Sequence, residues 1–388
     1  MRAYASTTRP LQATQATASE RGRSLLWLSR LILPVAFFGY GIWANLDILL
    51  EAGDRFELRG SVIRGEVTAG LAEDYARTMP HRVPAVAWIG AARYLLAGEG
   101  REGVLVGEDG WLFTEEEATF ASDRQIRRAV GEVRTAEARL ASVGAELVVV
   151  PVPAKADIQR EHGPDRRMAR MMERQHARFL AALREAGIEA VDMRPALLEV
   201  ASEGQAFLRR DTHWTPEGAT SVAQALAATG LVPAGGESFA RRDGQPVNVE
   251  GDLVSFVTSE PIARGLGLGP ERITPFVAEA AGLPANDIFA AQAPAIGTVL
   301  VGTSYSADDR WSFAAALSLA LGRDVLNLAE KGQGPVRPMR ALLADPARAG
   351  DAPEYVIWEF PVRYLGDPHI WPDDPETGPA SAQEGYQP

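Results

Sequence analysis

Cysteine is absent from this chain of 388 residues, and histidine occurs only five times. The first absence excludes disulfide bonds, catalytic thiolates and every metal site built on cysteine. It is compatible with an oxidising compartment but does not establish one. The scarcity of histidine leaves few candidates for a catalytic imidazole.

Positive charge is also in short supply, because 51 acidic residues face 39 basic ones and the formal net charge is −12. Residues 1–30 nevertheless hold five arginines and one acid, so they carry +4 and the remainder carries −16. A strongly acidic surface repels phosphate, so we expect no nucleic-acid binding by the remainder of the chain.

One segment has the composition of a membrane segment. Residues 31–46, LILPVAFFGYGIWANL, contain no charge; arginines precede them, and Asp47, Glu51 and Asp54 follow. The run is slightly short for a span of about 20 residues and long for a signal-peptide core of about 7–15. Arginine before and acid after predict that the N-terminus stays in the cytoplasm and the rest is exported.

We therefore expect residues 1–24 to be a cytoplasmic tail and residues 25–50 an uncleaved transmembrane signal anchor in the inner membrane. The body, 51–365, is then periplasmic, and residues 366–388 form a mobile tail. No convincing small-x-small cleavage site follows the apolar run, but a removed signal peptide stays open as the alternative. A buried core helix is disfavoured by the charged flanks.

Helical and apolar strand-like segments alternate through the body. Amphipathic segments end at Gly144 and Gly187, and each is followed at once by a short β-branched or apolar run. Such alternation predicts an α/β fold whose mainly parallel sheet is covered on both faces. Before it, the sequence predicts a hairpin that turns at residues 108–110. The predicted strands of the sheet are ELVVVPVP (146–153), IEAVDM (188–193), VLV (299–301), VLNLAE (325–330) and EYVIWEFPVRYL (354–365).

The segment RRDTHWTPEGA, residues 209–219, places Asp211 two positions before His213. Residues i and i+2 of an extended strand point the same way, so the two side chains can act together. In that arrangement His213 is a general base and Asp211 orients it. A metal site is the alternative, but without cysteine or a second histidine nearby its other ligands would be distant carboxylates.

The segment VGTSYSA, residues 301–307, connects a buried strand to an apolar helix. A serine at such a turn stands at the carboxyl edge of a parallel sheet, with N–H groups available for an oxyanion. Ser304 is therefore a candidate nucleophile. The alternative is that Ser304 or Ser306 simply caps the helix. A base and an orienting acid at residues 213 and 211 favour the nucleophile.

Seven segments in order resemble the SGNH-hydrolase-like domain of the alginate O-acetylation proteins, a family of polysaccharide O-acetyltransferases. The resemblance runs from about residue 100 to residue 365. The segments are DGWLF (109–113), VVVPVPAKADI (148–158), RDTHWTPEGA (210–219), EGDLVSF (250–256), GTSYS (302–306), GQGP (332–335) and VIWEFPVRYL (356–365).

The resemblance implies a three-layer SGNH-hydrolase-like fold and a triad of Ser304, His213 and Asp211. Asp and His precede Ser, which is a permuted order for SGNH hydrolases. We expect oxyanion donors from the backbone of Ser304 and from the loop that holds Gly332 and Gly334, since glycine allows close approach. The candidates for substrate binding are Tyr305, Arg209, Lys155 and Arg363, each of which can equally lie on a solvated rim. Trp214 is a further candidate, although a tryptophan beside a strand is more commonly a packing anchor.

We expect an exopolysaccharide O-acetyltransferase that works through an acetyl-serine intermediate. The resemblance implies a membrane-bound O-acyltransferase as acetyl supplier, and we expect no cofactor and no metal. The acceptor stays open between alginate, which the acidic body repels except at a local basic cleft, and a neutral glucan such as cellulose. An exported carbohydrate acetylesterase and a non-catalytic polysaccharide-binding assembly subunit are the alternatives.

Overall fold

The structure, a computed structural model, describes residues 16–51, 61–62, 64–79, 82–281, 297–345 and 353–371. It separates into two compact units, Met1–Val86 and Ala87–Pro388. The larger unit thus begins later than residue 51, where the sequence analysis placed the start of the body. Most of the tails expected at 1–24 and 366–388, namely residues 1–15 and 372–388, lies outside the described residues.

The first unit contains α1 (Ala16–Glu51) and α2 (Glu66–Thr78), and α3 (Arg82–Ala97) crosses into the second. Large apolar side chains of α1, such as those of Leu33 and Phe37, are exposed. In the described part of the chain, no helix combines the length and the apolar character that a membrane crossing requires. The structure therefore does not show the transmembrane anchor expected over residues 25–50.

A four-stranded parallel sheet lies at the centre of the larger unit. Its strand order is β3-β10-β8-β9, and β10 pairs along its whole length with β3. Because all four strands run in the same direction, the segments that follow them emerge at one edge of the sheet. The strands are β3 (Glu146–Val152), β8 (Thr298–Val301), β9 (Val325–Asn327) and β10 (Tyr355–Pro361).

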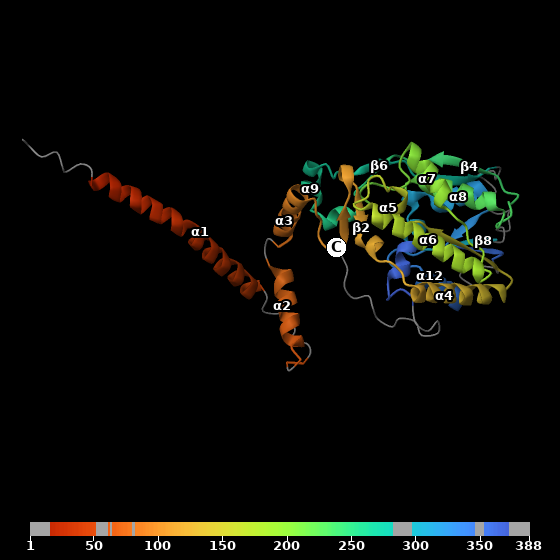
Figure 1. Cartoon of the computed structure of the whole chain (residues 1–388), viewed down its shortest axis with the longest axis horizontal. Coiled ribbons are helices and arrows are strands. Elements are labelled where there is room, and N and C mark those ends of the chain that lie inside the picture. Colours follow the sequence, from red (N-terminus) through yellow and green to blue (C-terminus); the bar gives the residue numbers. More distant parts are fainter. Residues whose placement is uncertain are drawn as a thin grey trace, which may run out of the picture. The chain divides into compact units, whose positions relative to one another are not determined.

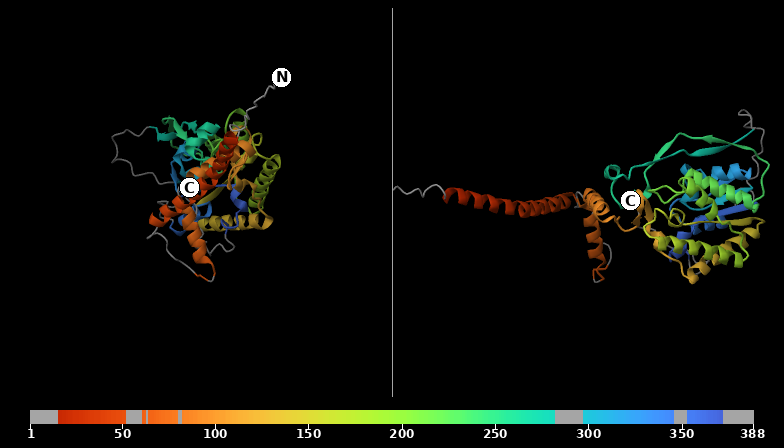
Figure 2. Two further views of the ribbon diagram at one scale, coloured as in Figure 1. Left: turned by 90° about the vertical axis from the view of Figure 1, so that its left-hand side faces the viewer. Right: turned by 45° about the horizontal axis from the view of Figure 1, so that its top comes forward.

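Alternate residues of these strands belong to two separate cores. Val148 and Val150 of β3 pack with helices on one face, whereas Leu147 and Val149 pack on the other. Figure 1 shows α7 and α8 on one side of β8 and α4 and α12 on the other, and Figure 2 shows the same layers from two more sides. The first layer is α7 (Arg194–Glu203), α8 (Pro216–Thr229) and α11 (Phe313–Leu321); the second is α4 (Asp123–Ala141), α6 (Arg166–Glu185) and α12 (Val336–Ala344).

Three antiparallel pairs lie beside this sheet. The predicted hairpin is present, with a 3-10 turn at Glu108–Gly110 between its strands. The other two pairs were not predicted from the sequence. The pairs are β1 (Val104–Val106) with β2 (Leu112–Thr114), β4 (Phe239–Asp243) with β7 (Phe276–Ala280), and β5 (Val247–Val249) with β6 (Glu271–Ile273); the short helices are α5 (Lys155–Ile158), α9 (Glu260–Ala263) and α10 (Ser304–Ala307).

One expectation about local structure is wrong. The segment 188–193 forms only an isolated bridge between Ala190 and Val149, because Asp192 then accepts a hydrogen bond from the Arg194 amide and turns the chain into α7. Residues 366–371, the first residues of the tail expected at 366–388, lie against the protein. Trp371 is 1% exposed, packs on Phe360, and donates from Nε1 to the Tyr364 carbonyl.

Replacing Trp371 with alanine should lower the free energy of unfolding by about 3–5 kcal/mol, because it opens a large cavity against the α4–α6 core. Chemical denaturation followed by circular dichroism measures this change. His369→Ala, at an exposed site two residues away, is the control and should change little. An equal effect of both variants would mean that Trp371 contributes no packing.

Candidate active site

Ser304 is the first residue of α10, in the turn that follows β8. We call residues 302–306 the serine turn. Thr303 caps α10, since its Oγ1 accepts a hydrogen bond from the Tyr305 amide, so the Ser304 hydroxyl is not occupied in capping. The helix is a single turn, and α11 begins only at Phe313, rather than directly after the turn as expected.

Asp211 and His213 lie in a bend, not on the extended strand that the sequence analysis expected. The bend is closed by an isolated bridge between Phe207 and Trp214, and we call residues 207–214 the histidine loop. The two side chains still meet, because Asp211 Oδ1 also accepts a hydrogen bond from the His213 amide at 3.0 Å. This local turn brings i and i+2 together without a strand.

The histidine loop and the serine turn bring three side chains into line. His213 Nε2 lies 2.7 Å from Ser304 Oγ, and His213 Nδ1 lies 2.5 Å from Asp211 Oδ1. An ionised carboxylate only accepts hydrogen bonds, so Nδ1 carries the proton and Nε2 is the acceptor for the serine hydroxyl. Burial acts to raise the pKa of Asp211, but His213 and the hydrogen bonds outweigh it and hold that pKa below its usual value.

Aromatic rings hold the imidazole in place. The His213 ring stacks on Trp311 at 5.1 Å between centroids and contacts Tyr305 at 4.8 Å. Both aromatic side chains are buried. The imidazole is therefore fixed by packing as well as by its hydrogen bonds.

A second carboxylate, Asp252, borders the site and was not identified from the sequence. Its Oδ1 and Oδ2 accept hydrogen bonds from the amide and hydroxyl of Thr212, and its own amide donates to Asp211 Oδ2 at 3.2 Å. A β-carbon on Gly251 would overlap the Arg210 carbonyl oxygen, so only glycine allows this approach. The glycine followed by aspartate in EGDLVSF is the sequence feature from which Asp252 could have been predicted.

Within the described residues, Asp211, His213 and Asp252 form a group that could supply three ligand atoms to a metal ion, all within 4.8 Å of one another. Two ligands of a tetrahedral ion at about 2.0 Å lie roughly 3.3 Å apart. His213 Nδ1 and Asp211 Oδ1 are only 2.5 Å apart, which is a hydrogen-bond distance. The donor set as arranged therefore fits a proton between these atoms better than a metal.

Glu359, in the middle of β10, lies beneath the serine turn and was also missed. Its carboxylate is buried and accepts hydrogen bonds from the Thr303 amide at 3.0 Å, the Thr303 hydroxyl at 3.0 Å and the Ser306 hydroxyl at 2.7 Å. Burial raises the pKa of Glu359, against the lowering effect of these hydrogen bonds. A single acidic residue inside the apolar run VIWEFP is the sequence feature from which Glu359 could have been predicted.

Lys155 does not face a cleft, contrary to the expectation. Its buried Nζ donates to the carbonyl oxygens of Leu112, Arg209 and Asp211 at 2.6–2.9 Å, so it supports the histidine loop from behind. Burial lowers its pKa to about 8, although Glu117 acts to raise it. Three ammonium protons match the three carbonyls, which explains why the lysine is needed there.

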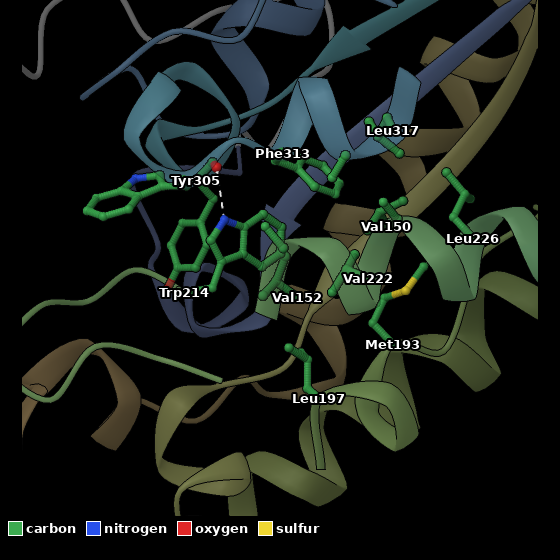
Figure 3. Packing of buried hydrophobic residues seen from close by; sticks show 14 of the residues in the cluster. Val150, Val152, Met193, Leu197, Trp214, Val222, Leu226, Tyr305, Phe313 and Leu317 are labelled. Carbon is green, nitrogen blue, oxygen red and sulfur yellow. Dashed lines mark hydrogen bonds between the residues drawn. The ribbon is translucent and has the colours of Figure 1, made fainter. Parts of the chain in front are cut away.

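Tyr305, Arg363 and Trp214 are also buried and do not line a substrate surface. Arg363 donates to the Tyr305 hydroxyl at 2.7 Å and to Glu116 at 2.7 Å. Trp214 packs among Tyr305, Phe313 and neighbouring aliphatic side chains and donates to the Tyr305 carbonyl at 3.1 Å (Figure 3). Their bulk fills the core behind the serine turn. The packing role that was the commoner alternative for Trp214 thus describes its place in the structure, and the structure places Tyr305 and Arg363 in the core as well.

Arg209, in contrast, is exposed. It lines a surface pocket of about 760 Å³ between α7, the start of α8 and β6, together with Arg210 and Arg272. Glu203 and Glu271 line the same pocket, so its charge is mixed. The substrate-binding role of Arg209 stays a prediction.

The loop at 327–334 runs beside the serine turn. The Glu330 amide donates to the Gly302 carbonyl at 3.2 Å, and Asn327 donates to the Ser306 carbonyl at 2.7 Å. Lys331 pairs with Asp308 at 2.9 Å. Gly332 and Gly334 in this loop have φ of 69° and 62°, which explains the two glycines. Their role as oxyanion donors stays a prediction.

Comparison with known proteins gives the family. Residues 104–362, more than half of the chain, match the family model described as the SGNH hydrolase-like domain of acetyltransferase AlgX. The chain belongs to this family. The α/β fold with a parallel sheet, which the sequence resemblance implied, is confirmed.

Individual relatives agree with this assignment. A probable alginate O-acetylase AlgJ of Pseudomonas aeruginosa is 38% identical over 319 residues, 78% of this chain and 81% of that protein. The O-acetyltransferase domain of Pseudomonas putida AlgJ matches with a TM-score of 0.60 at 34% identity, covering 68% of this chain and 93% of that one. Pseudomonas aeruginosa AlgX matches with a TM-score of 0.55 at 25% identity, covering 74% and 68%.

Glu359→Gln should slow the reaction of Ser304 by about 10- to 100-fold, because the amide places a donor against the Thr303 and Ser306 donors and shifts the serine turn. Release of p-nitrophenol from p-nitrophenyl acetate measures the rate. Glu354→Gln, at an exposed site just before the same strand, is the matched control. Equal rates for wild type and Glu359→Gln would show that the turn keeps its position without this carboxylate.

Asp308 should make the folded state sensitive to acid. Burial acts to raise its pKa, but hydrogen bonds from Arg310 and Lys331 outweigh it and depress that pKa. A depressed carboxyl pKa contributes stability above the unfolded value of about 4, and this contribution is lost as the pH falls toward the folded value. Asp308→Asn should therefore cost about 1 kcal/mol at neutral pH.

Denaturant unfolding of both proteins between pH 7 and pH 3 tests this expectation. Wild type should lose more stability over that range than Asp308→Asn does. Asp309→Asn, at the exposed neighbouring position, is the control. Parallel pH dependences for wild type and Asp308→Asn would contradict the expectation.

Proposed function

We propose that the chain is an exopolysaccharide O-acetyltransferase that carries acetyl on Ser304. The observation that supports this most is the alignment of Ser304 Oγ, His213 and Asp211 at 2.7 and 2.5 Å. A serine hydroxyl becomes nucleophilic when an imidazole takes its proton, and the imidazole needs an acceptor at its other nitrogen. Membership of an acetyltransferase family supports the same activity.

In the first half-reaction, His213 Nε2 takes the Ser304 proton while Oγ attacks the acetyl carbonyl carbon. The carbonyl oxygen becomes negative and is stabilised by the Ser304 amide and by amides of the loop that contains Gly332 and Gly334. The tetrahedral intermediate then breaks its bond to the leaving group, which receives the proton from His213. Acetyl-serine remains, and Asp211 keeps the proton on Nδ1 throughout.

In the second half-reaction, a sugar hydroxyl takes the place of the leaving group. His213 Nε2 removes its proton, the sugar oxygen attacks the acetyl carbon, and the bond to Ser304 Oγ breaks. His213 returns its proton to Ser304. Transfer exceeds hydrolysis only if the bound sugar excludes water from the acetyl-serine.

Alginate is the acceptor that we propose. Several relatives at 34–38% identity bear the name probable alginate O-acetylase, which supports it. In the pocket beside the histidine loop, Arg209, Arg210 and Arg272 balance Glu203, Glu217 and Glu271, so a uronate is repelled less there than by the acidic remainder of the surface. The neutral glucan considered above has no comparable support.

We also propose that the larger unit works in the periplasm and is held at the inner membrane by the apolar segment 31–46. The charge-free sequence of this segment and its exposed apolar side chains support this location. Acetyl donors such as acetyl-CoA stay in the cytoplasm, so the acetyl group has to cross the bilayer. A membrane-bound O-acyltransferase is the partner that we propose for this step.

Ser304→Ala should lower acetyl transfer by about 1000-fold or more, because no other oxygen occupies the nucleophile position. The purified protein is incubated with an activated acetyl ester and alginate oligosaccharides, and mass spectrometry detects added acetyl groups. Ser202→Ala, on an exposed face of α7, is the control.

Three outcomes of this experiment separate the candidate functions. Acetyl on the sugars in wild type but not in Ser304→Ala supports the transferase. Release of free acetate with unmodified sugars would make the chain an acetylesterase. Neither acetylated sugars nor free acetate above a protein-free blank, in wild type as in Ser304→Ala, would leave only the non-catalytic role.

A further inference from the structure

Helix α3 presents opposite faces to the protein and to solvent. On one face, Ala87, Gly90 and Ala91 are buried. A β-carbon on Gly90 would overlap the Val257 carbonyl oxygen, and Thr258 donates to the Ala87 carbonyl at 2.8 Å. This close packing fixes how the helix is rotated on the larger unit, so the opposite face points away from that unit.

Five apolar residues lie together on that opposite face, and Arg82 and Arg93 lie at one edge of it. Trp88, Ile89, Leu95 and Leu96 are 65%, 63%, 67% and 88% exposed, and Ala92 between them is exposed too. Their spacing of i, i+1, i+4, i+7 and i+8 is that of a helix face which normally covers a core. We call these five residues the outer face of α3. An exposed apolar surface of this kind marks an interaction site.

The chemistry of the helix favours a lipid surface as its occupant. Helices that lie in a membrane interface carry tryptophan, leucine and isoleucine on one face, and their charged residues are basic. Helix α3 holds Arg82 and Arg93 and no acid, in a chain of net charge −12. Arg93 pairs at 3.0 Å with Glu99, which lies beyond the helix. Among the surfaces of an acidic protein, this helix is one that anionic headgroups do not repel.

The chain order points the same way. Only residues 47–81 separate the apolar segment 31–46 from α3, so a membrane that holds the first lies within reach of the second. We propose that the outer face of α3 lies in the headgroup region of a bilayer that contains anionic lipid. The larger unit then has its own contact with the membrane, independent of α1. This proposal does not depend on acetyl transfer.

Tryptophan fluorescence with brominated lipids tests this contact in the full-length chain. Of the eight tryptophans, Trp27 and Trp43 lie on α1 and are replaced with phenylalanine. The five in the body are buried: Trp111, Trp214, Trp311, Trp358 and Trp371. Trp88 is then the exposed tryptophan, and its emission is the difference between this protein and the same protein with Trp88→Phe.

We expect vesicles of phosphatidylglycerol and brominated phosphatidylcholine to shift the Trp88 emission to the blue and to quench it. Leu95→Asp with Leu96→Asp should abolish both effects while α1 still carries the protein into the vesicle pellet. Val277→Asp, at an exposed apolar site on β7, is the matched control and should leave the quenching unchanged. Unchanged circular dichroism shows that the exposed substitutions do not unfold the protein.

Unquenched Trp88 emission would overturn the proposal, whether or not the protein sediments with the vesicles. Quenching that survives Leu95→Asp with Leu96→Asp would overturn it as well, because the outer face would then not be the contact. Oxidation of Trp88 is a further test. If native membranes protect Trp88 from oxidation but lipid vesicles do not, a protein partner covers the outer face, and the proposed lipid contact is wrong.

Discussion

Parallel pairing of β3, β10 and β8 is the constraint on which the site depends. It places the segments after all three strands at one edge of the sheet, where Lys155, Arg363 and Ser304 emerge from regions far apart in the sequence. A parallel sheet needs helices on both faces, so the edge is the part of it that remains open. The histidine loop comes from between the helices and completes the site at this edge.

Beneath this edge, two buried ionisable side chains hold the serine turn and the histidine loop in fixed positions. Glu359 binds the serine turn through three donors, and Lys155 binds the histidine loop through three carbonyls. Burying such groups is costly unless every donor and acceptor is matched, as it is here. These hydrogen bonds offset the cost of burial and also fix the serine turn and the histidine loop. They therefore help to set the distance between His213 and Ser304.

The sequence predicted which three polar side chains lie together better than it predicted their surroundings. Ser304, His213 and Asp211 were identified because a serine in a strand-to-helix turn and an Asp-x-His pair together supply the hydroxyl, imidazole and carboxylate of a triad. The local structure predicted for Asp211 and His213 was wrong, because an aspartate turn and an extended strand both bring residues i and i+2 together. The hairpin and the sheet were predictable from apolar patterning; the β4–β7 and β5–β6 pairs were not, because their strands are mostly exposed and carry little of it.

Lys155 and Trp214 show why the substrate residues were harder to predict. Sequence position places a side chain near the open edge but does not say whether it turns outward or back into the protein. Only the three-dimensional arrangement shows that carbonyls surround one and aromatic rings the other. Asp252 and Glu359 were not predicted at all. Each is a single acidic residue in a segment that contributed only to the family resemblance, so neither side chain was considered by itself.

The packing of His213 against Trp311 and Tyr305 has a kinetic consequence for the proposed reaction. A clamped imidazole cannot flip over to present its other nitrogen, so the same Nε2 has to serve both the departing donor and the arriving sugar. The leaving group of the donor and the sugar hydroxyl must then occupy one side of the acetyl group in turn. Donor and acceptor consequently exclude each other, and each is an inhibitor of the other's half-cycle.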